Sequence, residues 1–265
     1  QMGAVLLAFE GMSILSLLIQ KKRIPAVIWI QTAITFVAFV ILFMAPGNEM
    51  RVASEITTWM PGYKELSVGN HVFMTIQWML SSFANEGKAF FIAIWAAGFL
   101  LLMKSKKVKV YQILTVVFSV AAILPYAGIT FFSEMGIGDI DIEQCLMELP
   151  TWQSMTTQNR IAFFWWIAAV LFTLVLLWKV TGHSVFISMV FLGGIASEAV
   201  LYFSPTIYAS GARVYYLTDL MYLFIILWMV MRMDSEKKKN LFIAGAAALG
   251  VINFLSQYSI MLLKL

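Results

Sequence analysis

The pattern of apolar and polar positions divides this chain of 265 residues into long apolar runs separated by short polar or basic segments. About 20 apolar residues in a helix cross a hydrocarbon core of about 30 Å, and eight runs come close to that length. The sequence therefore predicts an all-α fold, a polytopic transmembrane helical bundle forming a single domain over residues 1–265. The predicted spans, of which the third is short, cover residues 2–19, 24–44, 89–103, 110–132, 161–178, 185–203, 214–231 and 241–263.

One further apolar segment, residues 71–83 with the sequence HVFMTIQWMLSSF, lies between the second and third spans. It is too short to cross the membrane. We expect it to form an interfacial helix on the extracytoplasmic side, with Trp59 and Trp78 at the headgroup level where amphipathic rings collect. It either packs on the bundle or lines a groove for a lipid substrate.

The basic residues give the bundle an orientation, because short loops rich in Lys and Arg stay in the cytoplasm. They follow the first, third, fifth and seventh spans. The other face receives the long segments 45–88 and 133–160 and most of the acidic residues, so we expect these segments to be extracytoplasmic. The basic residues concerned are Lys21, Lys22, Arg23, Lys104, Lys106, Lys107, Lys109, Lys179, Arg232, Lys237, Lys238 and Lys239.

This topology places the first residue outside the cytoplasm, although no secretory signal sequence precedes the first apolar run. A further span upstream of Gln1 would explain that arrangement. We therefore expect the chain to be part of a longer protein.

Composition supports the membrane prediction. The chain is 61% hydrophobic and only 12% charged, against about 25% charged in soluble domains, so most of it does not face water. The net charge of +4 comes from short clusters and not from a basic stripe, which argues against nucleic acid as a partner.

Residues that bind metals or form disulfides are few. Cys145 is the only cysteine, which excludes an intrachain disulfide, and the two histidines, His71 and His183, fall on opposite predicted faces. We expect no cofactor. One alternative is a divalent cation in the second long outer loop at Asp139, Asp141 and Glu143, but these alternating acids lack the calcium-loop pattern and also suit solvated side chains.

The first motif-like segment is APGNEMR, residues 45–51, at the outer end of the second span. Pro46 and Gly47 predict a turn that ends the helix, which Asn48 can cap, and Arg51 returns a fixed positive charge to the membrane surface. Two interpretations stay open. Arg51 either only snorkels beside a helix-ending turn or directs its guanidinium at a phosphate.

The second segment is SPTIYASGAR, residues 204–213, at the outer end of the sixth span. A Ser204–Pro205 turn, small residues and Arg213 repeat the chemistry of the first segment at the same depth, so helix packing could bring the two arginines together at one phosphate. Just beyond it lie Tyr215, Tyr216 and Asp219. An ion pair between Arg213 and Asp219 is the competing structural explanation.

Two acidic residues interrupt apolar spans: Glu10 in the first and Glu198 in the sixth. Ionisable groups at membrane depth are rare and often functional. Gly193 and Gly194 would permit close helix contact near Glu198, which could share an outer pocket with Arg51 and Arg213. The alternative is a protonated glutamate that hydrogen-bonds inside the bundle.

The APGNEMR turn, followed some 160 residues later by SPTIYASGAR, resembles the bacterial polytopic glycosyltransferases of the GT-C superfamily, including the serotype-converting glucosyltransferase-like proteins. The resemblance covers these two segments and the hydropathy pattern. It implies an enzyme of the bacterial plasma membrane that transfers a sugar from a polyprenyl-phosphate donor to a glycan acceptor at the cell surface. It further implies that Arg51 and Arg213 contact the donor phosphate while Asn48 shapes the turn.

The resemblance also implies a catalytic acid in the first outer loop, which in this numbering would lie upstream of Gln1. Either that acid is not in this chain, or Glu10 or a later acid such as Glu198 replaces it. The sequence thus predicts a membrane glycosyltransferase or its C-terminal half. A transporter or lipid-linked sugar flippase, with Glu10 and Glu198 as proton or substrate sites, is the rival, and a non-catalytic membrane scaffold is a third possibility.

Overall fold

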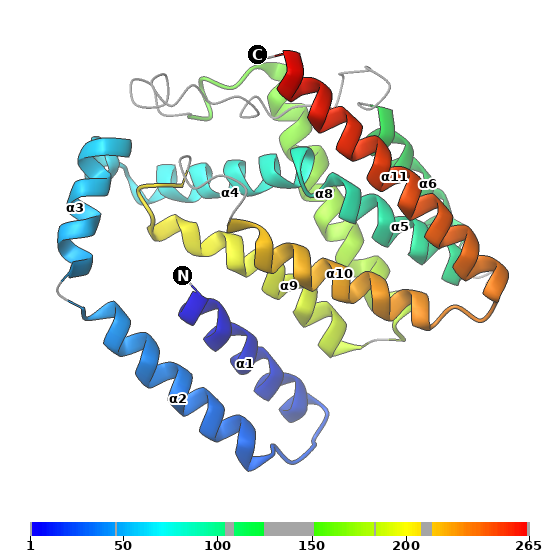
Figure 1. Cartoon of the computed structure of the whole chain (residues 1–265), viewed down its shortest axis with the longest axis horizontal. Coiled ribbons are helices and arrows are strands. Elements are labelled where there is room, and N and C mark those ends of the chain that lie inside the picture. Colours follow the sequence, from blue (N-terminus) through cyan, green and yellow to red (C-terminus); the bar gives the residue numbers. More distant parts are fainter. Residues whose placement is uncertain are drawn as a thin grey trace. The chain divides into compact units, whose positions relative to one another are not determined.

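A computed structural model describes residues 2–45, 47–103, 109–124, 151–182, 184–207 and 214–263, and within these ranges every regular element is a helix. The all-α prediction is therefore confirmed for the described part of the chain (Figure 1). The elements are α1 (Met2–Ile19), α2 (Ala26–Phe43), α3 (Gly47–Trp59), the 3-10 helix η1 (Tyr63–Glu65), α4 (Val68–Asn85), α5 (Lys88–Leu102), α6 (Lys109–Ile123), α8 (Thr157–Val180), α9 (Val185–Ala199), the 3-10 helix η5 (Val200–Phe203), α10 (Tyr216–Met231) and α11 (Glu236–Leu263).

Each of the eight predicted spans contains one of these helices, but their lengths differ from the prediction. Two helices are long and apolar enough to cross a membrane, namely Thr157–Val180 and the continuous run Val185–Tyr202. A third span is possible if α4 and α5 cross together, although they are bent by 68° at the break between them. The described helices thus include two or three candidate spans by length and composition.

The segment between α2 and α5 is more helical than we predicted. Residues 71–83, expected to form an interfacial helix, lie within the 18-residue helix α4, and α3 is a helix that the sequence pattern did not predict. Trp59 is 38% exposed, whereas Trp78 is only 4% exposed. The expectation that both tryptophans face the headgroups is therefore wrong for Trp78, because its ring is enclosed by other side chains of the protein.

The described chain forms two compact units, and the boundaries between them fall inside α4 and α10. The first unit comprises residues 1–79, 139–155 and 184–221, and the second comprises residues 80–138, 156–183 and 222–265.

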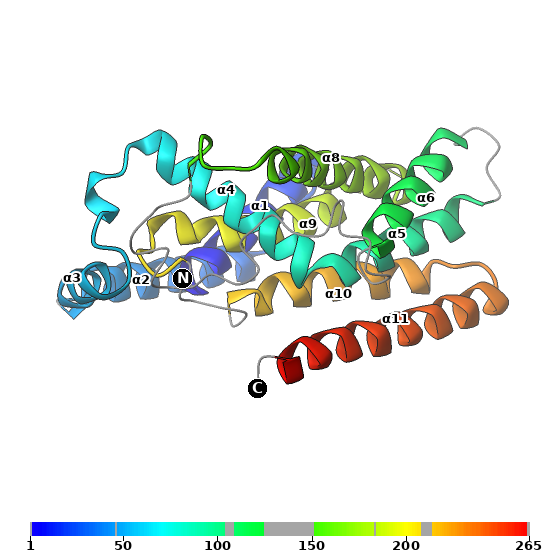
Figure 2. The same cartoon turned by 90° about the horizontal axis from the view of Figure 1, so that it is seen from above.

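In the first unit, α1 packs against both α2 and α9 (Figures 1 and 2). Glycines allow these helices to approach closely, as small residues do at helix interfaces in membranes. A Cβ atom on Gly3 would lie 3.2 Å from the ring of Phe39, and one on Gly193 would lie 3.0 Å from the Cε atom of Met12. The predicted close helix contact at Gly193 is thereby confirmed.

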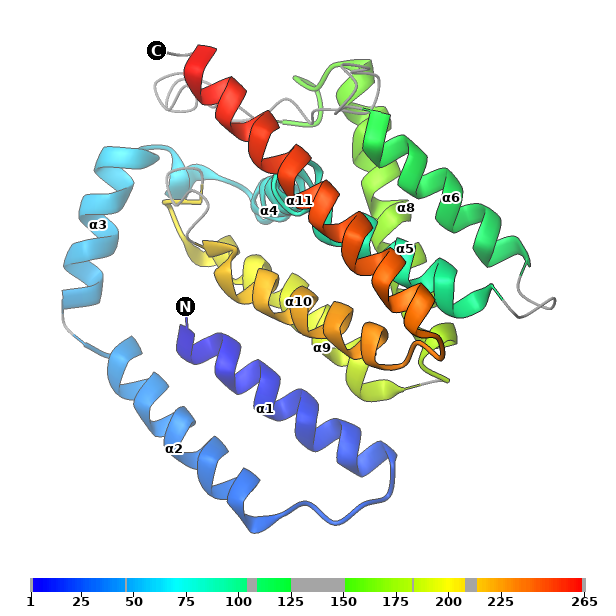
Figure 3. The same ribbon diagram turned by 45° about the vertical axis from the view of Figure 1, so that its right-hand side comes forward.

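In the second unit, α5 is the central helix and packs against α6, α8 and α11 (Figure 3). Its core is aromatic, with Trp95 and Phe91 fully buried. The Nε1 atom of Trp95 donates a hydrogen bond of 2.8 Å to the hydroxyl of Thr173 on α8, which satisfies the one polar group that this ring buries.

Helices α5 and α8 pack tightly at Gly98, where a Cβ atom would lie 2.8 Å from the Cδ2 atom of the fully buried Leu176. We expect Gly98→Ala to lower the stability by about 1–3 kcal/mol, as overpacking of a filled core does. Gly250→Ala on α11 is the matched control, because its Cβ atom meets no other atom within 4 Å. Thermal unfolding of the purified protein measures the difference, and equal midpoints would contradict the packing described.

Candidate functional site

The first motif begins where α2 ends. The backbone N–H of Met44 donates to the carbonyl of Val40 at 2.9 Å, and the helix stops there. The predicted break is thus present, although Pro46 itself lies outside the described residues. A new helix, α3, begins at Gly47, so Asn48 occupies the first turn of α3 and does not end a helix. The expected helix-ending turn is therefore a short break between two helices.

Arg51 lies on the exposed side of α3. Its Nε atom donates to the Oε1 atom of Glu55 at 2.7 Å, and the Arg51 side chain is 73% exposed. Exposed ion pairs with a spacing of four residues along a helix contribute only about 0.3–0.5 kcal/mol. This contact therefore holds the guanidinium weakly, and both interpretations of Arg51 remain open.

The second motif follows η5, in a turn built on hydroxyl groups. The Ser204 and Thr206 hydroxyls lie 2.8 Å apart, and the backbone N–H of Ile207 donates to the Ser204 carbonyl at 3.3 Å. Pro205 is buried within this turn. The predicted Ser-Pro turn is confirmed, whereas Arg213 lies outside the described residues.

Beyond the turn, α10 begins at Tyr216, and Asp219 lies in its first turn. The backbone N–H of Asp219 donates to the carbonyl of Tyr215 at 2.8 Å. A carboxylate in the first turn of a helix is favoured by the helix dipole. This position gives Asp219 a structural role that needs no partner arginine.

The segment after α3 packs directly onto this turn. The contact is a cluster of buried side chains, here called the Met–Trp cluster, that joins residues 60–79 to the end of η5 and to the turn after it. Tyr215 lies at its margin, with its ring centroid 5.2 Å from that of Trp78. Two segments more than 120 residues apart thus meet in the first unit. The members of the cluster are Met60, Met74, Trp78, Met79, Leu201 and Ile207.

Beside the Met–Trp cluster, three polar aromatic side chains meet. The ring of His71 lies 4.7 Å from that of Tyr63 and 5.4 Å from that of Tyr202. The Tyr63 hydroxyl donates to the backbone carbonyl of Tyr202 at 3.1 Å. Burial raises the pKa of Tyr63, and the neighbouring Tyr202 raises it further, so this phenol remains a hydrogen-bond donor at neutral pH.

His71 was not among the residues selected from the sequence. Its Nε2 atom is buried and has no hydrogen-bond partner within the described structure. A polar atom of this kind is uncommon in folded proteins and calls for an explanation. No signal in the sequence singles out this group, because Tyr63 and His71 lie more than 120 residues from Tyr202.

The two acids within apolar helices are both buried, and Glu10 contacts a neighbouring helix. The Thr35 hydroxyl on α2 donates to the Oε1 atom of Glu10 at 2.9 Å, while Oε2 is buried without a hydrogen-bond partner in the described structure. The interpretation of Glu10 as a hydrogen-bonded group inside the bundle is thus supported for one of its two oxygens.

Glu198 is only 1% exposed and lies on α9 between Ile195 and Ala199, which both pack against the Met–Trp cluster. Nearby, the carbonyl of Gly194 accepts hydrogen bonds from Ser197 at 2.7 Å and from Thr218 at 3.1 Å. Glu198 lies three residues after Ile195 and three before Leu201, so helical spacing places it on the side of α9 that packs against the Met–Trp cluster, whereas Glu10 belongs to the contact between α1 and α2.

The acids considered for a divalent cation, Asp139, Asp141 and Glu143, lie outside the described residues. Among the residues that the structure does describe, no group of three or more His, Cys, Asp and Glu side chains is arranged to hold a metal ion.

Comparisons with known proteins give no further assignment: no protein-family model, no curated protein and no solved structure matches the chain. The site must therefore be interpreted from its own geometry.

The Met–Trp cluster yields a direct test. We expect Trp78→Ala to lower the free energy of unfolding by about 3–5 kcal/mol, since truncating a buried aromatic residue leaves a cavity. Trp59→Ala, which removes the same ring from an exposed position on α3, should change it by about 0.5 kcal/mol or less. Chemical denaturation of the full chain compares the two variants. Equal losses would show that Trp78 is not the buried anchor of this contact.

Proposed function

We propose that this chain is a membrane glycosyltransferase, or the C-terminal half of one, that transfers a sugar from a polyprenyl-phosphate donor to a cell-surface glycan. It would work as a multi-pass protein of the bacterial plasma membrane with eight spans, its reaction centre on the extracytoplasmic side. One observation carries the proposal: the Met–Trp cluster joins the segment after Arg51 to the turn before Arg213.

The membrane location is supported by the surfaces of the helices as well as by their length. Along α2, apolar side chains such as Val27, Ile34 and Ile41 are 65–70% exposed. Extended apolar surfaces of this kind are rare on soluble monomers and mark contact with lipid or with another protein. The helices with exposed apolar faces suit a bilayer as their solvent.

In the proposed reaction, Arg51 and Arg213 bind the phosphate of the donor. The acceptor hydroxyl oxygen attacks the anomeric carbon of the sugar, the bond from that carbon to the phosphate oxygen breaks, and polyprenyl phosphate leaves with the electron pair. Fixed guanidinium charges stabilise the negative charge that grows on the leaving phosphate. The weak, exposed pair with Glu55 leaves Arg51 free to exchange its partner for a phosphate.

A carboxylate has to take the proton of the acceptor hydroxyl. Of the two candidates, we assign this role to Glu198, because it lies on the helix face that packs against the Met–Trp cluster. Glu10 already accepts a hydrogen bond from Thr35 at the contact of α1 with α2. The burial of Glu198 also keeps away the water that would otherwise hydrolyse the donor.

A proton-coupled transporter is the second candidate function, and the burial of Glu10 and Glu198 favours it. Buried acids in membrane helices form proton relays in many transporters. Under the transferase proposal, Glu198→Gln abolishes sugar transfer while Glu10→Gln preserves it. If the chain is instead a transporter, these variants lose pH-dependent uptake, and the unmodified protein forms no glycan product.

The phosphate role of the arginines is tested by transfer assays on membranes that contain the full chain and a polyprenyl-phosphate sugar. We expect Arg51→Ala and Arg213→Ala each to lower the rate by about 10²- to 10³-fold, the usual effect of removing one charge-stabilising donor. Arg51→Lys should recover only part of the rate, because an ammonium group does not make the bidentate contact with phosphate that a guanidinium makes.

The matched control is Glu55→Gln, which breaks the same ion pair but keeps the guanidinium. It should retain full activity if Arg51 binds phosphate. If Glu55→Gln and Arg51→Ala lose activity equally, Arg51 acts through its ion pair on α3. Normal transfer in both arginine variants would remove the phosphate hypothesis.

A further inference from the structure

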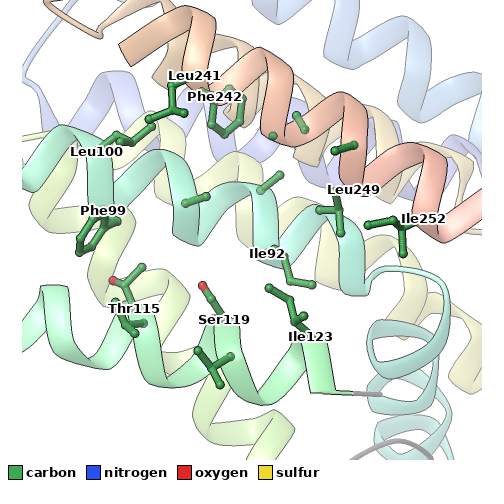
Figure 4. Close-up of a pocket in the computed structure, with 17 residues that line it drawn as sticks. Ile92, Phe99, Leu100, Thr115, Ser119, Ile123, Leu241, Phe242, Leu249 and Ile252 are labelled. Atoms are coloured by element: carbon green, nitrogen blue, oxygen red, sulfur yellow. The ribbon is translucent and has the colours of Figure 1, made fainter. Parts of the chain in front are cut away.

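A long apolar groove lies in the second unit, remote in sequence from both motifs. Helices α5, α6 and α11 enclose a cavity of about 540 Å³ (Figure 4). It runs from Leu100 and Phe242 at one end to Ile123 and Ile252 at the other. The rest of the lining is apolar apart from Thr115 and Ser119.

Small residues keep this groove open. Gly245, Ala246 and Ala248 on α11 and Ala93 and Ala96 on α5 are part of its lining. A Cβ atom on Gly245 would meet no other atom within 4 Å, so nothing in the described protein fills the space above this residue.

The lining carries few groups that could bind a polar ligand. The hydroxyl of Thr115 donates to the backbone carbonyl of Tyr111 at 2.6 Å and is thereby satisfied. Ser119 carries the other hydroxyl of the lining. A groove of this composition suits a hydrocarbon chain.

One end of the groove is positively charged. The Nζ atom of Lys238 donates to the carbonyl of Leu100, a lining residue, at 2.9 Å. The side-chain amide of Gln112 donates to the Leu102 carbonyl at 2.6 Å, which places the start of α6 at the same end. The Lys, Arg, Asp and Glu residues that the structure describes at the start of α6, at the start of α11 and in the loop before α11 are Lys109, Arg232, Lys237, Lys238 and Lys239 against Asp234 and Glu236.

The acids at this end are already occupied. Asp234 pairs with Lys238 at 3.2 Å, and Glu236 pairs with Lys239 at 2.7 Å. Lys109 and Lys237 are exposed. The end of the groove that begins at Leu100 therefore carries a surplus of positive charge.

The length of the groove identifies its occupant. From Leu241 to Ile252 the lining follows α11 over 12 residues, and their 11 steps of 1.5 Å span about 16 Å, which is about half of a hydrocarbon core of about 30 Å. That length matches one leaflet, and therefore one acyl chain, and is too short for a polyprenyl chain.

We propose that this groove binds an anionic phospholipid, with one acyl chain against Gly245 and Ala246 and the phosphate near Lys109 and Lys237. The proposal rests on the membrane location given above and not on the transfer reaction. Basic residues beside a membrane helix attract acidic headgroups, by about fivefold in affinity for each lysine near the surface.

The test uses the full chain reconstituted in phosphatidylcholine vesicles that contain photoactivatable phosphatidylglycerol or photoactivatable phosphatidylcholine, each with the reactive group in an acyl chain. We expect phosphatidylglycerol to label α5, α6 and α11 more strongly. The double variant Lys109→Gln with Lys237→Gln should lose this preference by about 25-fold at low salt, and salt should weaken the preference in the unmodified protein.

The groove itself is tested by Gly245→Phe, which fills it, against Gly250→Phe on the same helix. A Cβ atom added to either glycine would have no other atom within 4 Å, but only Gly245 lines the groove. Gly245→Phe should abolish labelling and Gly250→Phe should not. Equal labelling in these two variants, equal labelling by the two lipids, or displacement of the probe by polyprenyl phosphate would each overturn the proposal. Sugar transfer is not measured, so failure here leaves the proposed function untouched.

Discussion

The packing of residues 60–79 onto the turn that follows α9 is the contact on which the candidate site depends. Trp78 and the three methionines around it fill the space against Leu201 and Ile207. Methionine side chains adapt to irregular gaps, and the tryptophan supplies a large rigid ring that contacts Tyr215. Without this contact, no described packing would connect the segment that follows the first motif to the turn of the second motif.

Burial of polar groups distinguishes the interior of the first unit from its surface. Glu10, Glu198 and the Nε2 atom of His71 are shielded from solvent, whereas Arg51 is exposed and weakly paired. A buried carboxylate or imidazole without full hydrogen bonding costs free energy, and such groups persist where function requires them. The proposed transfer reaction uses both kinds of group, the exposed Arg51 for the donor phosphate and the buried Glu198 for the acceptor proton.

The sequence predicted the helical class and the positions of eight of the described helices, because long apolar runs are a strong signal. It did not predict α3, since GNEMRVASEITTW has too little apolar character to suggest a buried face. It also placed Trp78 in the interface, because the burial of this ring depends on Leu201, Ile207 and Tyr215, which lie more than 120 positions away. The Ser204–Pro205 turn and the close contact at Gly193 were predictable from local chemistry, but the grouping of Tyr63, His71 and Tyr202 was not.

The contact between residues 60–79 and Tyr215 can be measured in the intact protein by a photoreactive phenylalanine analogue placed at position 215. The substitution retains an aromatic ring at a partly buried position, so the fold should be preserved. We predict that mass spectrometry finds the cross-link on the peptide that contains Met74, Trp78 and Met79. Cross-links confined to other segments would contradict the packing from which the proposed site is built.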